Sequence, residues 1–353
     1  MPHEPLLTSV VGSYAHPGWF AHAIAAAERG EYGPADLSEL LDDGVELAIR
    51  DQERAGIDVV SDGEMRRAGF FTAEFYRHLT GIREVPPRRR LGVLAHDALP
   101  RFAVEHEIRA PDGLGVVDEY RSARTRTDRP IKVTLPGPFT LAGRLVTGEG
   151  LAYPTRNAAS VAFVSILRDE IDGLVAAGAT SVQVDEPSVA IRPGAGADFA
   201  SLLNEAVAPA RGRARVATHL CFGNFLGRPL ARRSYRLVLD AMLAFDVDEL
   251  VLEFANREMS EVGILREITD AGKDVAVGVI DVKNSHVETA EDVAGRIEAI
   301  LATGVPPERL TLVPDCGLSQ TPRHVAVAKL DALVAGRNLV RQRVAAARTS
   351  TPA

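Results

Sequence analysis

Short apolar runs and longer amphipathic segments alternate along most of the chain. Eight runs have the length and the β-branched content of buried strands; they span residues 9–14, 57–63, 131–138, 181–187, 215–222, 249–255, 275–282 and 310–317. The segments between them repeat apolar residues at helical spacing, as over 37–50, 160–175 and 290–301. Near-continuous apolar strands joined through helices indicate a parallel sheet that is covered on both faces.

The number of strands favours a closed barrel over an open sheet. Eight β–α units predict an α/β fold, a single (β/α)8 barrel of the TIM type that occupies residues 1–346, with residues 347–353 as a disordered tail. A doubly wound open sheet is the alternative. The G-x-G-x-x-G turn that would favour it is absent after the first strand.

One segment interrupts the alternation. Residues 84–129 contain a basic cluster and a two-residue alternation over 102–108, which predicts a β-hairpin insertion after the second strand. Such a segment is either a solvated excursion or a lid or docking surface, and the pattern alone leaves both open.

Composition and charge narrow the class of partner. The net charge of −8 argues against general affinity for nucleic acid or for an anionic membrane. No run of about 18 apolar residues appears, and the first residues lack a secretory pattern, so a cytoplasmic location is expected. In a reducing cytosol the two cysteines, Cys221 and Cys316, are expected to bind a metal or to be buried rather than to form a disulfide.

Polar residues of metal-ligand type gather at the ends of the expected strands, where the functional groups of a barrel meet. These positions are Gly12–Ser13, Asp62–Glu64, Asp185–Pro187, His219–Cys221, Glu253, Asp281 and Asp315–Gly317. His219 and Cys221 are two residues apart, so on an extended strand they point the same way. With Cys316 and Glu253 they could converge on zinc. Taken alone, however, the pair fits ordinary core packing better.

The order and spacing of these strings resemble a known family. The sequence contains V-V-G-S-Y, D-G-E, Q-V-D-E-P, H-L-C-F-G-N-F, V-L-E, G-V-I-D-V and P-D-C-G-L. Together they resemble the catalytic domain of cobalamin-independent methionine synthase over nearly the whole chain. The resemblance implies a Zn2+ site formed by His219, Cys221, Glu253 and Cys316. It also implies that homocysteine is held at its amino-acid end by Val11, Ser13, Glu64 and Asp185.

The implied reaction is methyl transfer to the sulfur of homocysteine, giving methionine. A free thiol is mostly protonated at neutral pH, whereas a zinc-bound thiol is deprotonated. Two cysteine thiolates and a carboxylate outweigh the charge of Zn2+, so an added substrate thiolate is expected to stay nucleophilic. Glu253 is the ligand expected to loosen when that thiolate arrives.

The chain departs from the larger members of the family in two respects. It has no room for their N-terminal half, and its D-V-K-N-S-H string keeps Asp281, expected to be catalytic, but has Lys283 in place of a histidine that helps to protonate the leaving folate nitrogen. Methyl transfer from folate needs such an acid. Lys283 would need a strongly lowered pKa for this role, and His286 is a possible substitute. The methyl donor is therefore expected to be methylcobalamin or a corrinoid protein, with residues 84–129 as a candidate docking surface.

Other functions remain as alternatives. The donor could be 5-methyltetrahydrofolate, or the acceptor another thiol such as coenzyme M. The related uroporphyrinogen decarboxylases are metal-free barrels with no use for this ligand set. A non-enzymatic barrel could bind a thiol or hold a structural zinc, although structural sites usually have closely spaced cysteines rather than ligands from three distant strands.

Overall fold

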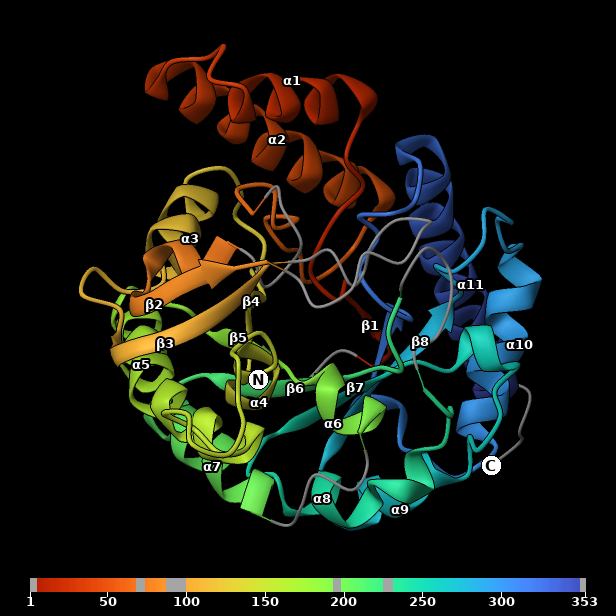
Figure 1. The fold of residues 1–353 in the computed structure, drawn as a ribbon. Coiled ribbons are helices and arrows are strands. Elements are labelled where there is room, and N and C mark those ends of the chain that lie inside the picture. Colours follow the sequence, from red (N-terminus) through yellow and green to blue (C-terminus); the bar gives the residue numbers. More distant parts are fainter. Residues whose placement is uncertain (1–4, 68–73, 87–99, 193–197, 225–230, 350–353) are drawn as a thin grey trace.

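A curled parallel sheet forms the centre of the protein (Figure 1). The computed structural model describes residues 5–67, 74–86, 100–192, 198–224 and 231–349. The sheet has the order β1-β9-β8-β7-β6-β5-β4, and every neighbouring pair is parallel. Its strands are β1 (Leu7–Thr8), β4 (Val133–Pro136), β5 (Ser181–Asp185), β6 (Arg215–Leu220), β7 (Glu249–Leu252), β8 (Asp274–Ile280) and β9 (Leu310–Pro314).

Two isolated bridges complete the ring. Ser9 pairs with Val59, and Val60 pairs with Ile131, both in parallel, so the segment around residue 60 lies between the first strand and the β4 side of the sheet. The predicted barrel is confirmed, but its second strand, expected over 57–63, is reduced to these single-residue bridges. Inside the ring lies a small apolar cluster of Val11, Ala217, Val251, Ala276 and Val313.

The ring is surrounded by helices, most of which lie on its outside (Figure 1). They are α1 (Gly18–Glu28), α2 (Pro34–Ala55), α3 (Val116–Arg124), α4 (Pro138–Ala142), α5 (Arg156–Ala176), α6 (Pro187–Ile191), α7 (Asp198–Val207), α8 (Leu239–Ala244), α9 (Ile264–Asp270), α10 (Ala290–Leu301) and α11 (Arg323–Thr349), with 3-10 turns η1 (Glu74–His78), η3 (Ala208–Ala210), η4 (Tyr235–Leu237), η5 (Ala255–Arg257) and η6 (Pro307–Arg309). The sequence sets several of their ends. Thr289 and Asp292 form a capping box that begins α10, and Gly56, with φ of 88°, ends α2.

The interruption after the second strand contains an antiparallel pair, β2 (Thr80–Val85) and β3 (Arg101–Arg109). The pair begins four residues before position 84, and the basic residues 88–90 lie outside the described residues. Helix α3 follows, and the buried Glu170 carboxylate fixes its start by accepting hydrogen bonds from the backbone N–H groups of Leu114 and Val117. At the C-terminus, α11 continues to Thr349, which takes it into the segment 347–353 expected as a tail.

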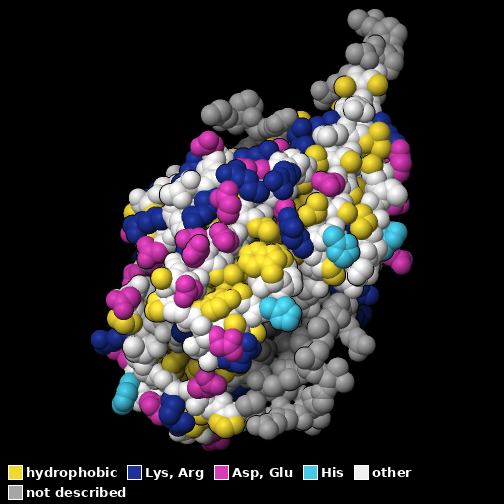
Figure 2. All heavy atoms as spheres, turned by 90° about the horizontal axis from the view of Figure 1, so that it is seen from above, with side chains coloured by type: hydrophobic (Ala, Val, Ile, Leu, Met, Phe, Trp, Pro, Cys, Tyr) yellow, Lys and Arg dark blue, Asp and Glu magenta, His cyan; other side chains and the backbone are white. Residues whose placement is uncertain are grey.

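The molecular surface carries charges of both signs. Figure 2 shows basic and acidic side chains side by side across one face. None of the helices in the described part of the chain is long and apolar enough to cross a membrane.

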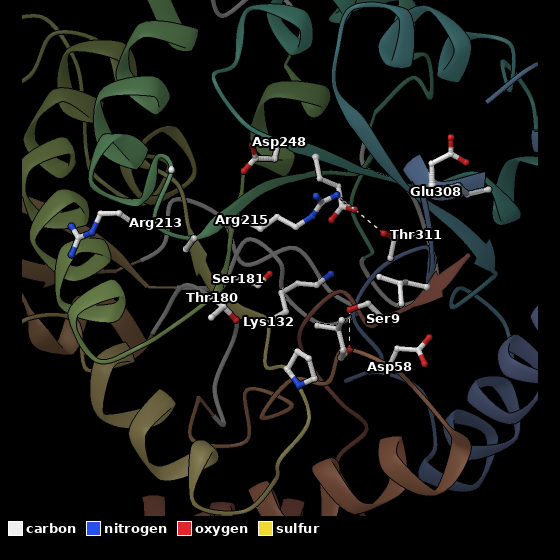
Figure 3. Close-up of a pocket in the computed structure, with 17 residues that line it drawn as sticks. Ser9, Asp58, Lys132, Thr180, Ser181, Arg213, Arg215, Asp248, Glu308 and Thr311 are labelled. Carbon is white, nitrogen blue, oxygen red and sulfur yellow. Dashed lines mark hydrogen bonds and ion pairs between the residues drawn. The ribbon is translucent and has the colours of Figure 1, made fainter. Parts of the chain in front are cut away.

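A cavity of about 640 Å³ lies at the end of the barrel where the strands begin (Figure 3). Two of the basic side chains that line it have partners within the protein. The Nζ atom of buried Lys132 donates to Gln183 Oε1 at 3.1 Å, and Arg215 Nη2 bridges Glu249 Oε1 at 3.0 Å and Asp274 Oδ2 at 2.8 Å. Satisfied charges at this end of a barrel are typical of a stabilising role.

Loss of the Arg215 bridge should destabilise the fold. Arg215→Met leaves the buried Glu249 and the half-buried Asp274 short of a donor, so we expect the free energy of unfolding to fall by roughly 1–3 kcal/mol in urea denaturation. Arg213→Met is the matched control, because Arg213 lines the same cavity but pairs with Asp172 in solvent; it should change the value by less than about 0.5 kcal/mol. Equal stability of the two variants would contradict the assignment.

Candidate metal centre

Three side chains of metal-ligand type meet at the opposite end of the barrel. His219 lies at the end of β6, Cys221 follows it, and Cys316 comes two residues after β9. The Sγ atom of Cys316 is 3.9 Å from His219 Nε2 and 3.9 Å from Cys221 Sγ. The three candidate ligand atoms all lie within 4.8 Å of one another. His219 and Cys221 are each 3% exposed, whereas Cys316 is only partly buried, so the group is open to the barrel mouth on the Cys316 side.

The spacing of these atoms fits zinc. Nitrogen and sulfur ligands at about 2.1 and 2.3 Å from zinc lie roughly 3.5–3.8 Å apart when the coordination is tetrahedral. The two separations of 3.9 Å are close to that range. One imidazole and two sulfurs are also a donor set that zinc prefers over the harder cations. The residues present therefore fit a zinc ion.

The imidazole of His219 is oriented by the backbone. Its Nδ1 atom lies 3.2 Å from the carbonyl oxygen of Val251 on the neighbouring strand. Because a carbonyl only accepts, Nδ1 must carry a proton, so in the neutral imidazole the lone pair is on Nε2, which faces Cys316. This is the tautomer that a metal requires.

The two thiols have opposite pKa shifts. The hydrogen bond shared with Cys221, together with nearby His219, lowers the pKa of Cys316 well below its usual value. The same hydrogen bond, followed by burial, raises the pKa of Cys221. The group thus favours a thiolate at Cys316, the form in which cysteine binds metals.

Glu253 lies beside this group without belonging to it. The structure brings together the other three expected ligands, whereas Glu253 Oε2 accepts a hydrogen bond from Lys283 Nζ at 2.6 Å. Its second oxygen, Oε1, is buried and has no hydrogen-bond partner among the described residues. Burial is the main reason that the pKa of Glu253 rises to about 7.

Two residues that the sequence did not single out for this purpose fix the chain around Glu253. The Tyr235 hydroxyl accepts from the backbone N–H of Glu253 and donates to the Leu220 carbonyl, both at 2.8 Å. The buried Asp315 carboxylate accepts the backbone N–H groups of the next three residues, 254–256. No local sequence signal marks Tyr235, because it lies on η4, 18 residues before Glu253.

The residues expected to bind substrate gather near the cysteines. Glu64 has a left-handed backbone, with φ of 54°, and its Oε1 accepts from Thr134 Oγ1 at 2.7 Å. A Cβ atom on Gly12 would lie 2.3 Å from that same oxygen, and one on Gly317 would lie 2.0 Å from Ser13 Oγ. These glycines therefore allow Glu64 and Ser13 to pack closely against the neighbouring loops.

Asp185 is the register partner of His219 on the adjacent strand. Burial raises the pKa of Asp185 to about 7, and the charges of Glu64 and Cys316 contribute in the same direction. Gln183 Nε2 holds the Asp185 carboxylate at 2.8 Å and also reaches the carbonyl of Val11 at 2.6 Å. Val11 itself points into the barrel cluster, so its side chain serves packing.

A buried ion pair behind Glu64 was not expected from the sequence. Arg67 Nη2 lies 2.6 Å from Glu119 Oε2, and Arg67 Nη1 lies 3.9 Å from Glu64 Oε1. Glu119 belongs to α3, within the interrupting segment 84–129. That segment therefore contributes to the surroundings of the site, and only the fold places it there.

The Asp281 carboxylate is engaged by its own loop. It accepts the backbone N–H of Lys283 at 2.8 Å and the side-chain amide of Asn284. Its own N–H donates to Glu288 Oε1 at 2.8 Å. This arrangement shapes the turn that carries Lys283, and a catalytic role for Asp281 stays a prediction. His286, the possible substitute acid, is exposed on the same loop.

Comparison with known proteins gives consistent matches over almost the full length. The family model "Cobalamin-independent synthase, Catalytic domain" matches residues 6–337. The methionine synthase of Thermococcus kodakarensis is 31% identical over 351 residues, 99% of this chain and 98% of that protein. That of Saccharolobus solfataricus is 31% identical over 346 residues, 97% of each. The structure of a B12-independent methionine synthase from Shewanella sp. W3-18-1 in complex with selenomethionine has a TM-score of 0.81 and 29% identity, covering 97% of this chain and 100% of that one.

Replacement of Cys316 should remove the metal. Cys316 lies between His219 and Cys221, so Cys316→Ser is expected to weaken zinc binding by on the order of 100-fold or more, as measured by chelator competition. Arg213→Met, at the other end of the barrel, should keep wild-type affinity. A Cys316→Ser protein with an undiminished zinc content after dialysis would rule out this ligand set.

Proposed function

The chain belongs to the cobalamin-independent methionine synthase family, and on that premise we propose that this methyltransferase depends on zinc and transfers a methyl group to homocysteine to make methionine. The observation that carries the proposal is the convergence of His219, Cys221 and Cys316. They come from two strand ends at the mouth of the barrel, where barrel enzymes have their active sites. His219 and Cys221 are buried and Cys316 is partly exposed, which suits the entry of a substrate thiol from the mouth of the barrel.

Each ligand has a role that follows from its chemistry. Zinc in this site would hold the homocysteine sulfur as a thiolate at neutral pH. His219 would bind through Nε2 of the neutral imidazole, because the Val251 carbonyl holds the proton on Nδ1. Cys221 and Cys316 contribute two negative charges, which keep the site electron-rich and the substrate sulfur nucleophilic. Glu253, which is bonded to Lys283 beside these three residues, would supply the fourth ligand in the absence of substrate.

The amino-acid end of homocysteine would lie against Ser13, Glu64 and Asp185. Glu64 and Asp185 are buried, and burial raises the pKa of each, so an ammonium group bound against them would favour their charged forms. Arg67, which approaches Glu64 at 3.9 Å, is paired more closely with Glu119 at 2.6 Å. Ser13 offers a hydroxyl beside the loop that carries Cys316, because Leu318 N–H donates to the Ser13 carbonyl at 2.7 Å. The substrate would thus span the barrel mouth between the carboxylates and the metal.

We assign methylcobalamin, free or on a corrinoid protein, as the methyl donor. Although burial lowers it, the pKa of Lys283 is raised overall by the Glu253 carboxylate, so Lys283 is a poor acid for a folate nitrogen. A methyl group on cobalt needs no such proton. In this proposal the corrinoid is a substrate that delivers its methyl group and leaves, not a bound cofactor.

A panel of donors and acceptors tests the assignment. Zinc-loaded protein should form methionine from homocysteine and methylcobalamin with a kcat/KM at least about tenfold above that for 5-methyltetrahydrofolate, and should not alkylate coenzyme M. Cys316→Ser measures the uncatalysed background. Turnover with 5-methyltetrahydrofolate but not with methylcobalamin would overturn the choice of donor. Alkylation of coenzyme M but not of homocysteine would overturn the choice of acceptor.

Gly12 tests the substrate pocket separately from the metal. In Gly12→Ala the new Cβ would collide with Glu64 Oε1, so the carboxylate must shift and the KM for homocysteine should rise about tenfold with unchanged zinc content. Gly18→Ala is the control, because its added Cβ would meet nothing within 4 Å. An unaltered KM in Gly12→Ala would remove Glu64 from the substrate site.

A further inference from the structure

A buried ion pair lies directly beside the candidate metal ligands. The Lys283 and Glu253 side chains are 5% and 0% exposed, and their charged atoms are 2.6 Å apart. They follow the ends of two neighbouring strands, β8 and β7, which pair in register up to Leu252 and Val277. Because an isolated buried charge is very costly, each side chain depends on the other unless a different partner is present.

The two oxygens of Glu253 have different surroundings. Oε2 is bonded to Lys283, whereas Oε1 is buried without a hydrogen-bond partner among the described residues. The backbone of Glu253 is held by Tyr235, so the carboxylate can move only through its side-chain torsions. Lys283 is held in turn by the Asp281 carboxylate, which accepts its backbone N–H. The backbones of both residues are thus held, and only a change in side-chain torsions would carry the Glu253 carboxylate from the ammonium to the metal ligands.

Charge balance shows what the ammonium contributes. Two cysteine thiolates neutralise one Zn2+, so a bound substrate thiolate brings the site to −1 and the Glu253 carboxylate would bring it to −2. The charge of Lys283 offsets that last step. A carboxylate that shares its charge with an ammonium is also a weaker metal ligand than a free one.

We propose that Lys283 is a positioning residue that draws the Glu253 carboxylate away from the metal and thereby makes Glu253 the ligand that the substrate thiol replaces. The inference rests on the proposed zinc site. The inference adds Lys283 to the proposed zinc site, because the lysine would then set how easily the substrate thiol replaces Glu253. Asp281 acts indirectly, through the turn that presents Lys283.

Binding measurements without a methyl donor test this role. Zinc affinity is measured by chelator competition, and homocysteine affinity by calorimetry on zinc-loaded protein. In Lys283→Met the carboxylate loses its counter-ion and should remain on the metal, so the Kd for zinc should fall about tenfold while the Kd for homocysteine rises about tenfold. Lys283→Arg, which restores the charge, should keep both constants within about threefold of wild type.

The opposite directions of the two shifts separate positioning from general damage. A Lys283→Met protein with both constants within about twofold of wild type, or with weakened zinc binding, would overturn the inference. If Lys283→Met does not fold, the same substitution is tested in Glu253→Gln protein, because the neutral amide of the glutamine needs no counter-ion. There, adding Lys283→Met should leave the homocysteine Kd within about threefold, and a tenfold loss would overturn the inference.

Failure of the proposed function looks different. Wild-type protein that binds neither zinc nor homocysteine would remove the zinc site itself. Wild-type protein that binds both, with Lys283→Met indistinguishable from it, would remove only the role of Lys283.

Discussion

Closure of the parallel ring is the constraint on which the candidate site depends. Cys316 and His219 are 97 residues apart in sequence, yet their side chains are 3.9 Å apart. They meet because β6 and β9 run in the same direction around one ring and end at the same rim. The ring is completed by single-residue bridges at Val59 and Val60, and these also place the turn with Glu64 at that rim. The site residues therefore come together only when the ring is closed.

The buried charged groups at the two ends of the barrel differ in their hydrogen-bond partners. Where the strands begin, Arg215 bridges two carboxylates and Lys132 donates to Gln183, although burial lowers the pKa of Lys132 to about 8. Where they end, Glu253 keeps an unpartnered oxygen, and burial raises the pKa of Asp185 and Glu253 to about 7. Such groups cost stability in the folded protein by itself and are relieved by a cationic ligand. The asymmetry distinguishes a stabilising end from a ligand-binding end.

The fold could be predicted from the sequence because all eight apolar runs have the length and the β-branched residues of buried strands. It overstated the second strand, since residues 57–63 carry the apolar pattern of a strand but make only two bridges. Period-two alternation placed His219 and Cys221 on one face, and both now lie beside Cys316.

Other parts of the site could not be predicted from the sequence. Glu253 and Lys283 are 30 residues apart, and only side-chain torsions decide whether the carboxylate faces the lysine or the cysteines. The contacts of Tyr235 with Glu253 and of Arg67 with Glu119 likewise depend on tertiary packing. These pairs are far apart in the sequence and do not follow the helical or strand repeat, so no sequence pattern predicts them.

The central claim is that the His219, Cys221 and Cys316 group holds a zinc ion to which a substrate sulfur can be added. X-ray absorption at the zinc edge tests it most directly, on the same sample before and after homocysteine is added. We expect two sulfur ligands before and three after, with the loss of one oxygen ligand. An unchanged sulfur count after saturation with homocysteine would contradict it.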